Sequence, residues 1–219
     1  MTQFRNDEHH DRQMNMNAHF AWGLAFWASG EVCREQCLYL VAPVAYYYSV
    51  FHTGFSLLNT NLEIPLSDLY HIGHTDLQQW LLRILPLSTV EIFDRLRQTR
   101  EAVNYLSVGR PATKLRIVRG HPFGFKIEQP KPDGSGTEEI KTDFFKAVNE
   151  SATSSREFIE AALQIIEARC EELSWRGPKK NSSWFDEYLG EDLLLNIIPR
   201  EVSGRAVLMK MVSLMGVED

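Results

Sequence analysis

The sequence predicts a mainly α-helical protein that carries one small β-hairpin. The longest apolar run, Cys33–Leu58, repeats its large side chains with a period near 3.6 residues. Further stretches with helical spacing lie on both sides of it. Alternation of apolar and polar residues, as in β-strands, occurs within residues 109–131. The 219 residues are 44% apolar, which is enough for one or two compact domains.

Composition and missing motifs exclude several function classes. The net charge of −6 gives no overall attraction for nucleic acid, although a local basic patch can still bind it. The chain has three cysteines and no apolar leader of the signal-peptide type, so we expect a reducing, cytoplasmic setting. It contains no Gly-rich phosphate loop, Gly-x-Ser-x-Gly elbow, Cys-x-x-Cys pair or His-Glu-x-x-His helix, so most standard NTPase and hydrolase classes are unsupported.

Residues 1–17 are polar and carry both charge signs, which predicts a solvated, flexible N-terminus. His9 and His10 lie close to two aspartates, but a frayed terminus is favoured over a metal site. From Ala18 the pattern changes, and Phe20, Leu24 and Trp27 recur at helical spacing. This predicts a helix that ends near Gly30 and packs antiparallel to the next one.

The central apolar run predicts a helix that is covered on most sides. Its window from Cys37 to Leu58 has no formal charge and is long enough to span a bilayer. Its tyrosines, however, lie in the middle rather than at the ends, so we favour a bundle helix and no membrane span. His52 follows Tyr48 by four residues and therefore shares a helix surface with it. The alternative is that His52 is a core histidine whose hydrogen bonds are satisfied and that it has no functional role.

Two further helices are expected before residue 109. Residues 77–85 form an apolar face that ends at Pro86, and Ser88 with Glu91 forms a capping box for a helix that ends near Tyr105. His71 and His74 are three residues apart, but no third ligand lies nearby. We therefore predict a capped turn there rather than a zinc site.

Residues 109–131 are basic, with six Lys or Arg against one Glu and thus a net charge of +5. Residues 114–119 and 123–128 alternate like two strands joined through residues 120–122. Cations bind phosphates and aromatic rings stack on bases, so this hairpin is a candidate surface for single-stranded RNA. The candidate RNA-binding residues are Arg116, Arg119, Lys126, Phe123 and Phe125. A hairpin that covers the bundle with solvated lysines is the alternative.

The C-terminal part is predicted to be a helical extension. Residues 142–149 and 154–175 have helical patterns, as do the shorter stretches 184–198 and 203–215. We therefore divide the chain into a flexible N-terminus (1–17), a helical bundle (18–108), and a basic hairpin with a helical extension that packs on the bundle (109–219).

The order of aromatic and polar residues resembles the HEPN family over roughly residues 18–106. The resemblance rests on Ala-Tyr-Tyr-Tyr-Ser-Val-Phe-His at residues 45–52, His71-Ile72-Gly73-His74, and Arg-Glu-Ala-Val-Asn-Tyr at residues 100–105. It implies an antiparallel helical bundle that forms a homodimer and binds nucleotides or cleaves RNA without a metal or cofactor. It also implies a setting in microbial defence or toxin–antitoxin systems.

The chain departs from the family at one position. Active members carry an arginine followed by four to six residues and then the histidine, but the matching positions here hold Ala45, Tyr46 and Tyr47. Arg12 and His19 have a suitable spacing on an earlier helix and form an outside candidate pair.

The sequence is therefore consistent with two functions. The first is a ribonuclease in which His52 is the general acid or base, Tyr48 orients it or the phosphate, and Arg100 or a residue of a second subunit stabilises the charge. The resemblance adds Asn104 and Tyr105 to this site. The alternative is that these two residues have a structural role and close the helix. The second is a catalytically inactive module that binds a nucleotide, an RNA or a protein partner.

Overall fold

The computed structural model describes residues 2–105, 116–121, 124–130 and 135–178. They form a mainly α-helical fold, as predicted. The elements in chain order are α1 (Thr2–Glu35), α2 (Ala42–Asn59), α3 (Leu66–Leu69), α4 (His74–Leu81), α5 (Leu87–Tyr105), β1 (Arg116–His121), β2 (Gly124–Pro130), β3 (Thr137–Asp143) and α6 (Phe144–Leu173).

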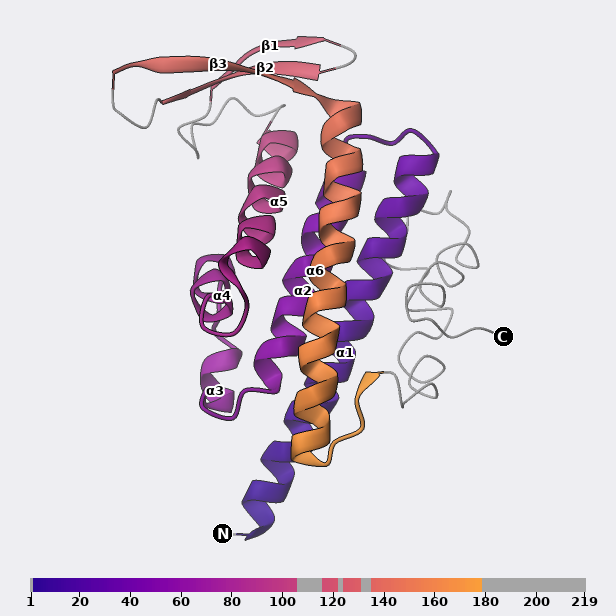
Figure 1. Ribbon diagram of the computed structural model, residues 1–219, viewed down its shortest axis with the longest axis vertical. Coiled ribbons are helices and arrows are strands. Elements are labelled where there is room, and N and C mark those ends of the chain that lie inside the picture. Colours follow the sequence, from indigo (N-terminus) through magenta and orange to yellow (C-terminus); the bar gives the residue numbers. More distant parts are fainter. Residues whose placement is uncertain (1, 106–115, 122–123, 131–134, 179–219) are drawn as a thin grey trace.

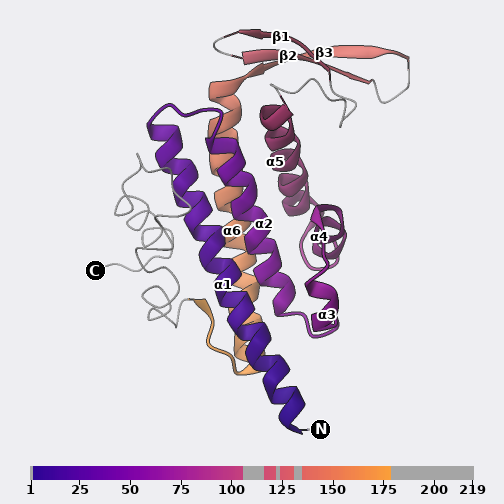
Figure 2. The same cartoon turned by 180° about the vertical axis from the view of Figure 1, so that it is seen from behind.

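The helix α2 lies at the centre of a bundle. The long helix α1 runs antiparallel to it, α5 lies along its other side, and α6 packs against all three from one face (Figure 1). Seen from behind, α1 and α2 lie in front of α6, so α2 has one face that α6 does not cover (Figure 2). Buried side chains of all four helices fill the interior, including Phe20, Leu24, Tyr46, Val50, Phe93, Phe158 and Ile166.

Two glycines allow α1 and α2 to approach closely. A Cβ atom at Gly23 would lie 2.4 Å from Thr53 Oγ1, and one at Gly30 would lie 2.6 Å from Cε1 of Tyr46. Glycine in a helix interior costs about 0.5–1 kcal/mol relative to alanine, and the close packing offsets that cost. The prediction that the helix ends near Gly30 is therefore wrong, because this residue makes room for the buried Tyr46 ring.

The first helix also begins earlier than expected, at Thr2 rather than Ala18. Arg12 and Met16 are both buried, so the structure differs from the predicted flexible segment. The Arg12 guanidinium donates to the carbonyls of Asn61 (3.3 Å) and Ile64, and to the Glu8 carboxylate (2.9 Å). Arg12 thus anchors the segment after α2 and does not form a catalytic pair with His19, which lies about 10 Å further along the helix axis.

The helix α6 is continuous, whereas the sequence predicted two helices with a break before Ser154. The hydroxyl of Ser151 donates to the Ala147 carbonyl at 2.7 Å, and that of Ser155 donates to the Ala152 carbonyl at 2.9 Å. Such bonds within the helix satisfy the hydroxyls without interrupting it. Directly before α6, Thr137–Asp143 forms the strand β3, which the sequence pattern did not predict.

The three strands form one antiparallel sheet in the order β1-β2-β3, above one end of the bundle (Figure 1). Gly120 and His121, which were assigned to a turn, pair with Phe125 and Gly124. Of the predicted RNA-binding residues, Arg116 and Arg119 lie on β1 and Lys126 and Phe125 on β2, while Phe123 lies outside the described residues. The predicted helices at 184–198 and 203–215 also lie outside them.

A search of the described helices for a membrane span finds none with enough length and apolar character.

Candidate functional site

The face of α2 that α6 leaves uncovered is a row of aromatic side chains. Every residue of α2 is buried except Val44, Tyr48, Phe51 and His52. Their spacing places them on one side of the helix. His19, Trp22 and Phe26 of α1 are also partly exposed and lie beside this row. We call these six ring-bearing residues, His19, Trp22, Phe26, Tyr48, Phe51 and His52, the aromatic strip.

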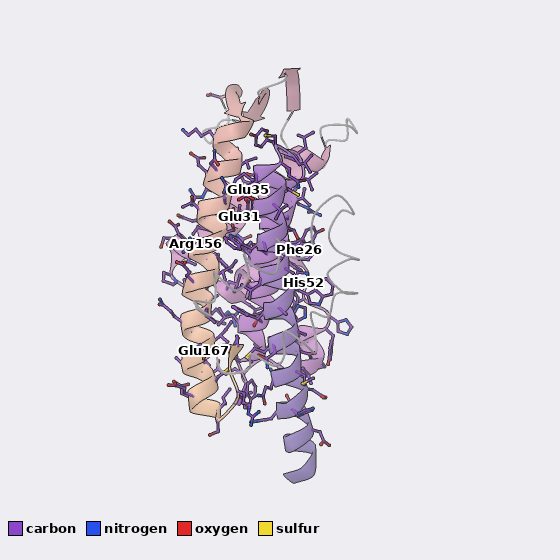
Figure 3. The ribbon with its side chains drawn as sticks, turned by 90° about the vertical axis from the view of Figure 1, so that its right-hand side faces the viewer. Phe26, Glu31, Glu35, His52, Arg156 and Glu167 are labelled. Carbon is purple, nitrogen blue, oxygen red and sulfur yellow. The ribbon has the colours of Figure 1, made fainter. Side chains whose placement is uncertain are left out.

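Phe26 connects the two helices within the strip. Its ring lies 5.4 Å from that of His52 and almost parallel to it, at 4°. It also lies 5.4 Å from the ring of Tyr48. Figure 3 shows Phe26 and His52 close together on one side of the bundle. Tyr48 and His52 therefore share a surface, as predicted, and Phe26 contacts both.

His52 has a second histidine as its hydrogen-bond partner. The Nδ1 atoms of His19 and His52 lie 3.0 Å apart, and the two rings stack at 5.3 Å. Burial lowers the pKa of His19, and burial together with the neighbouring His19 lowers the pKa of His52 to about 3. Both imidazoles are therefore neutral at neutral pH, and one Nδ1–H donates to the other Nδ1.

The structure brings together two predicted site residues from different helices. Nη2 of Arg100 on α5 donates to the Tyr48 hydroxyl at 3.2 Å. The guanidinium carbon lies 5.5 Å from the centroid of the Tyr48 ring and 5.2 Å from that of Tyr47, which are cation–π distances. Arg100 is linked to His52 only indirectly in the described part of the chain, through Tyr48 and Phe26.

Arg100 differs from its neighbour Arg97 in its charge partners. Arg97 contacts Asp94 at 2.8 Å and Glu101 at 3.6 Å. No ion pair of Arg100 with a carboxylate is found among the described residues, and its Nε is buried without a hydrogen-bond partner there. Within the described part of the chain, Arg100 is thus a cation at this site that has no carboxylate partner.

A further histidine, His74, lies at the α4–α5 side of the strip. The Tyr47 hydroxyl and Nδ1 of His74 form a short hydrogen bond, and the Phe51 ring lies 4.5 Å from the imidazole. Burial lowers the pKa of His74, and the positive charges of Arg100 and Arg97 lower it further against the opposing effect of Glu101. The backbone N–H of Gly73 donates to Asp76 at 3.2 Å, so the helix α4 begins with a capped turn.

Asn104 and Tyr105 lie at the C-terminal end of α5, so they share a helix with Arg100. The structure describes only their backbone. Within the residues whose side chains are described, no three His, Cys, Asp or Glu side chains gather in a way that would hold a metal ion.

The sequence did not single out His19 as the partner of His52, or His74 as the partner of Tyr47. One signal for His19 is that it shares a helical face with Trp22 and Phe26. No comparable signal links Tyr47 to His74, because the helix α3 and two loops lie between α2 and α4.

Comparisons with known proteins add no relative: the chain matches no protein-family model, no curated protein and no solved structure.

Proposed function

We propose that this chain is a HEPN-like module that binds single-stranded RNA or nucleotides on the aromatic strip. The observation that carries the proposal is the contact between Arg100 and Tyr48. It places a guanidinium without a carboxylate partner in the described part of the chain against a row of partly exposed rings.

The two parts of this site suit the two parts of a nucleotide. Partly exposed rings such as Trp22, Tyr48 and Phe51 offer faces and edges on which bases stack, a contact worth roughly 1–3 kcal/mol per base. The planar guanidinium of Arg100 binds phosphate oxygens through charged hydrogen bonds. The chain as a whole is acidic, so binding depends on this local arrangement rather than on net charge.

Binding is favoured over cleavage by the environment of His52. A general acid must carry a proton at the working pH, and the pKa of His52 is lowered to about 3 by burial and by His19. The arginine that active family members carry on the same helix is replaced by Ala45, Tyr46 or Tyr47.

A ribonuclease remains the second candidate, and the His19–His52 pair is the observation that favours it. When one Nδ1–H donates to the other Nδ1, one ring keeps a free Nε2 lone pair and the other keeps an Nε2–H. A neutral pair of this kind offers a base at one Nε2 and a hydrogen-bond donor at the other. In a homodimer, an arginine of a second copy would stabilise the phosphate charge, and a role in microbial defence or a toxin system belongs to this candidate.

The test measures binding of a short fluorescein-labelled single-stranded RNA to the full chain by fluorescence anisotropy. Arg100→Gln should weaken binding roughly tenfold or more, because a charged hydrogen bond to phosphate is lost. Arg95→Gln is the matched control, since Arg95 is exposed on the same helix and the substitution changes the net charge equally. Equal effects of the two variants would overturn the proposal.

The same samples decide between the two candidates. RNA recovered after incubation is separated on a denaturing gel, with native protein compared to His52→Ala and His19→Ala. Intact RNA in all samples supports a binding module. Cleavage by the native protein that both variants abolish supports the ribonuclease.

A further inference from the structure

We infer that His74 and Arg100 form a phosphate-binding subsite at the α4–α5 side of the aromatic strip, in which Nε2–H of His74 and the Arg100 guanidinium donate to the same phosphate group. This inference rests on the proposed function and adds a residue to it that neither the sequence pattern nor the resemblance assigned a role. We call these two residues the phosphate subsite.

The direction of the Tyr47–His74 hydrogen bond fixes the proton on His74. Tyr47 is fully buried, and burial raises the pKa of its hydroxyl, so the phenol is neutral. Its O–H has no other acceptor in the described part of the chain, and it therefore donates to Nδ1 of His74. A neutral imidazole that accepts at Nδ1 carries its proton on Nε2. His74 is thus held as a hydrogen-bond donor at Nε2.

The same buried phenol ring lies close to both His74 and Arg100. The His74 ring lies 5.6 Å from the Tyr47 ring, and the Arg100 guanidinium carbon lies 5.2 Å from it. One neutral donor and one cation therefore border a single ring. Nη2 of Arg100 donates to Tyr48, but the guanidinium has further N–H groups, and an oxyanion needs such donors.

The charges around the subsite favour one anionic group. Asp94 and Glu101 are both engaged by Arg97, at 2.8 and 3.6 Å, and among the described residues no carboxylate pairs with Arg100. A single cation with one neutral donor suits the single negative charge of an RNA phosphodiester. It also predicts weak binding of free inorganic phosphate, on the order of millimolar.

The position of the subsite fits a ligand that continues along the strip. Phe51 contacts the rings of both His74 (4.5 Å) and His52 (5.6 Å). A phosphate held by His74 and Arg100 would therefore place an attached base beside Phe51 and Tyr48. A nucleoside monophosphate should accordingly bind more tightly than phosphate alone.

The experiment uses the full chain and observes the imidazole nitrogens by long-range ¹H–¹⁵N NMR. The native protein should show His74 as the Nε2–H tautomer, and this signal should shift when inorganic phosphate or a nucleoside 5′-monophosphate is added. An Nδ1–H tautomer, or no shift at saturating concentrations of both ligands, would overturn the subsite.

Variants add a second readout, the affinity for the nucleoside monophosphate measured by calorimetry. His74→Ala should lower it roughly fivefold or more, whereas His71→Ala, at an exposed position three residues earlier, should leave it unchanged. If His74→Ala does not fold, Tyr47→Phe replaces it: the loss of the phenol O–H should produce some Nδ1–H tautomer and a smaller loss of affinity. Unchanged affinity in the folded variant contradicts the inference.

The outcomes separate this inference from the proposed function. RNA binding that depends on Arg100 but not on His74 removes the subsite and keeps the RNA-binding surface. Phosphate binding without RNA binding keeps the subsite and removes the surface. No binding of either ligand removes both.

Discussion

His19 on α1 and His52 on α2 form a hydrogen bond between their Nδ1 atoms, 3.0 Å apart, at a position where the chain is otherwise lined by aromatic rings. Two partly buried imidazoles in contact cannot both be protonated without repulsion, so the pair is neutral at neutral pH. This single contact has consequences for both stability and titration.

The His19–His52 pair should make the protein less stable in acid. The pKa of His52 is lowered from 6.5 to about 3 in the folded chain, so the unfolded chain binds the extra proton first as the pH falls. Stability should be constant above about pH 7 and decrease by about 3 kcal/mol between pH 7 and pH 4 on account of His52. Urea unfolding at a series of pH values measures this slope.

His52→Phe is the control for that slope, because it keeps a ring against Phe26 and removes the titrating group. It should reduce the pH dependence between pH 4 and pH 7, and His19 and His74, whose pKa values are also lowered, should cause part of the slope that remains. An unchanged slope would mean that other groups cause the acid sensitivity.

Replacing His19 should raise the pKa of His52 only in part. Burial is the larger cause of its low pKa and the charge of His19 is the smaller one. In His19→Phe, an NMR titration should therefore place the pKa of His52 above 3 but still clearly below 6.5. A value that returns to 6.5 would show that burial is not the main cause.

Gly23→Ala should be strongly destabilising, by about 2–3 kcal/mol in urea unfolding. The added methyl group would lie 2.4 Å from Thr53 Oγ1 and 3.1 Å from the Ser49 carbonyl oxygen. Combining it with Thr53→Ala removes the nearer obstacle and should restore part of the loss, so the two substitutions should not be additive. Additive effects would contradict the close approach of α1 and α2 at this point.

Tyr46→Phe should destabilise the bundle by about 1–2 kcal/mol. The buried Tyr46 hydroxyl donates to the Glu31 carboxylate at 2.7 Å, and Glu31 also accepts from Arg34 at 2.7 Å. The variant leaves one carboxylate oxygen without this donor. Tyr70→Phe, at a tyrosine that is 66% exposed, should change stability by less than about 0.5 kcal/mol. Similar effects of the two would rule out a structural role for the Glu31 contact.

Arg12→Ala should destabilise the chain by about 2–3 kcal/mol, because the guanidinium is 1% exposed and donates to the carbonyls of Asn61 and Ile64. Hydrogen exchange of the amides at 61–64 should increase at the same time. Arg169→Ala, whose side chain is 48% exposed, serves as the control. A stability loss without faster exchange at 61–64 would show that Arg12 acts elsewhere.

Periodicity in the sequence was enough to predict the mainly helical fold and the face of α2 on which His52 lies. Helical periodicity is a local property, so the spacing of Tyr48 and His52 was sufficient to place them on one surface. The same local reasoning placed helices at residues 77–85 and 88–105 to within a few residues of α4 and α5. It misplaced the ends of α1 because Gly30 and Arg12 take their roles from buried contacts with other elements.

Which helix faces meet could not be predicted from the sequence. Periodicity gives the exposed side of each helix but neither the register between two helices nor the order in which they surround a third. The pairing of His19 with His52, of Arg100 with Tyr48 and of His74 with Tyr47 each joins residues 27 to 52 positions apart in the sequence. Those contacts depend on how α1, α4 and α5 pack around α2, and they give the aromatic strip its donors, its acceptors and its available cation.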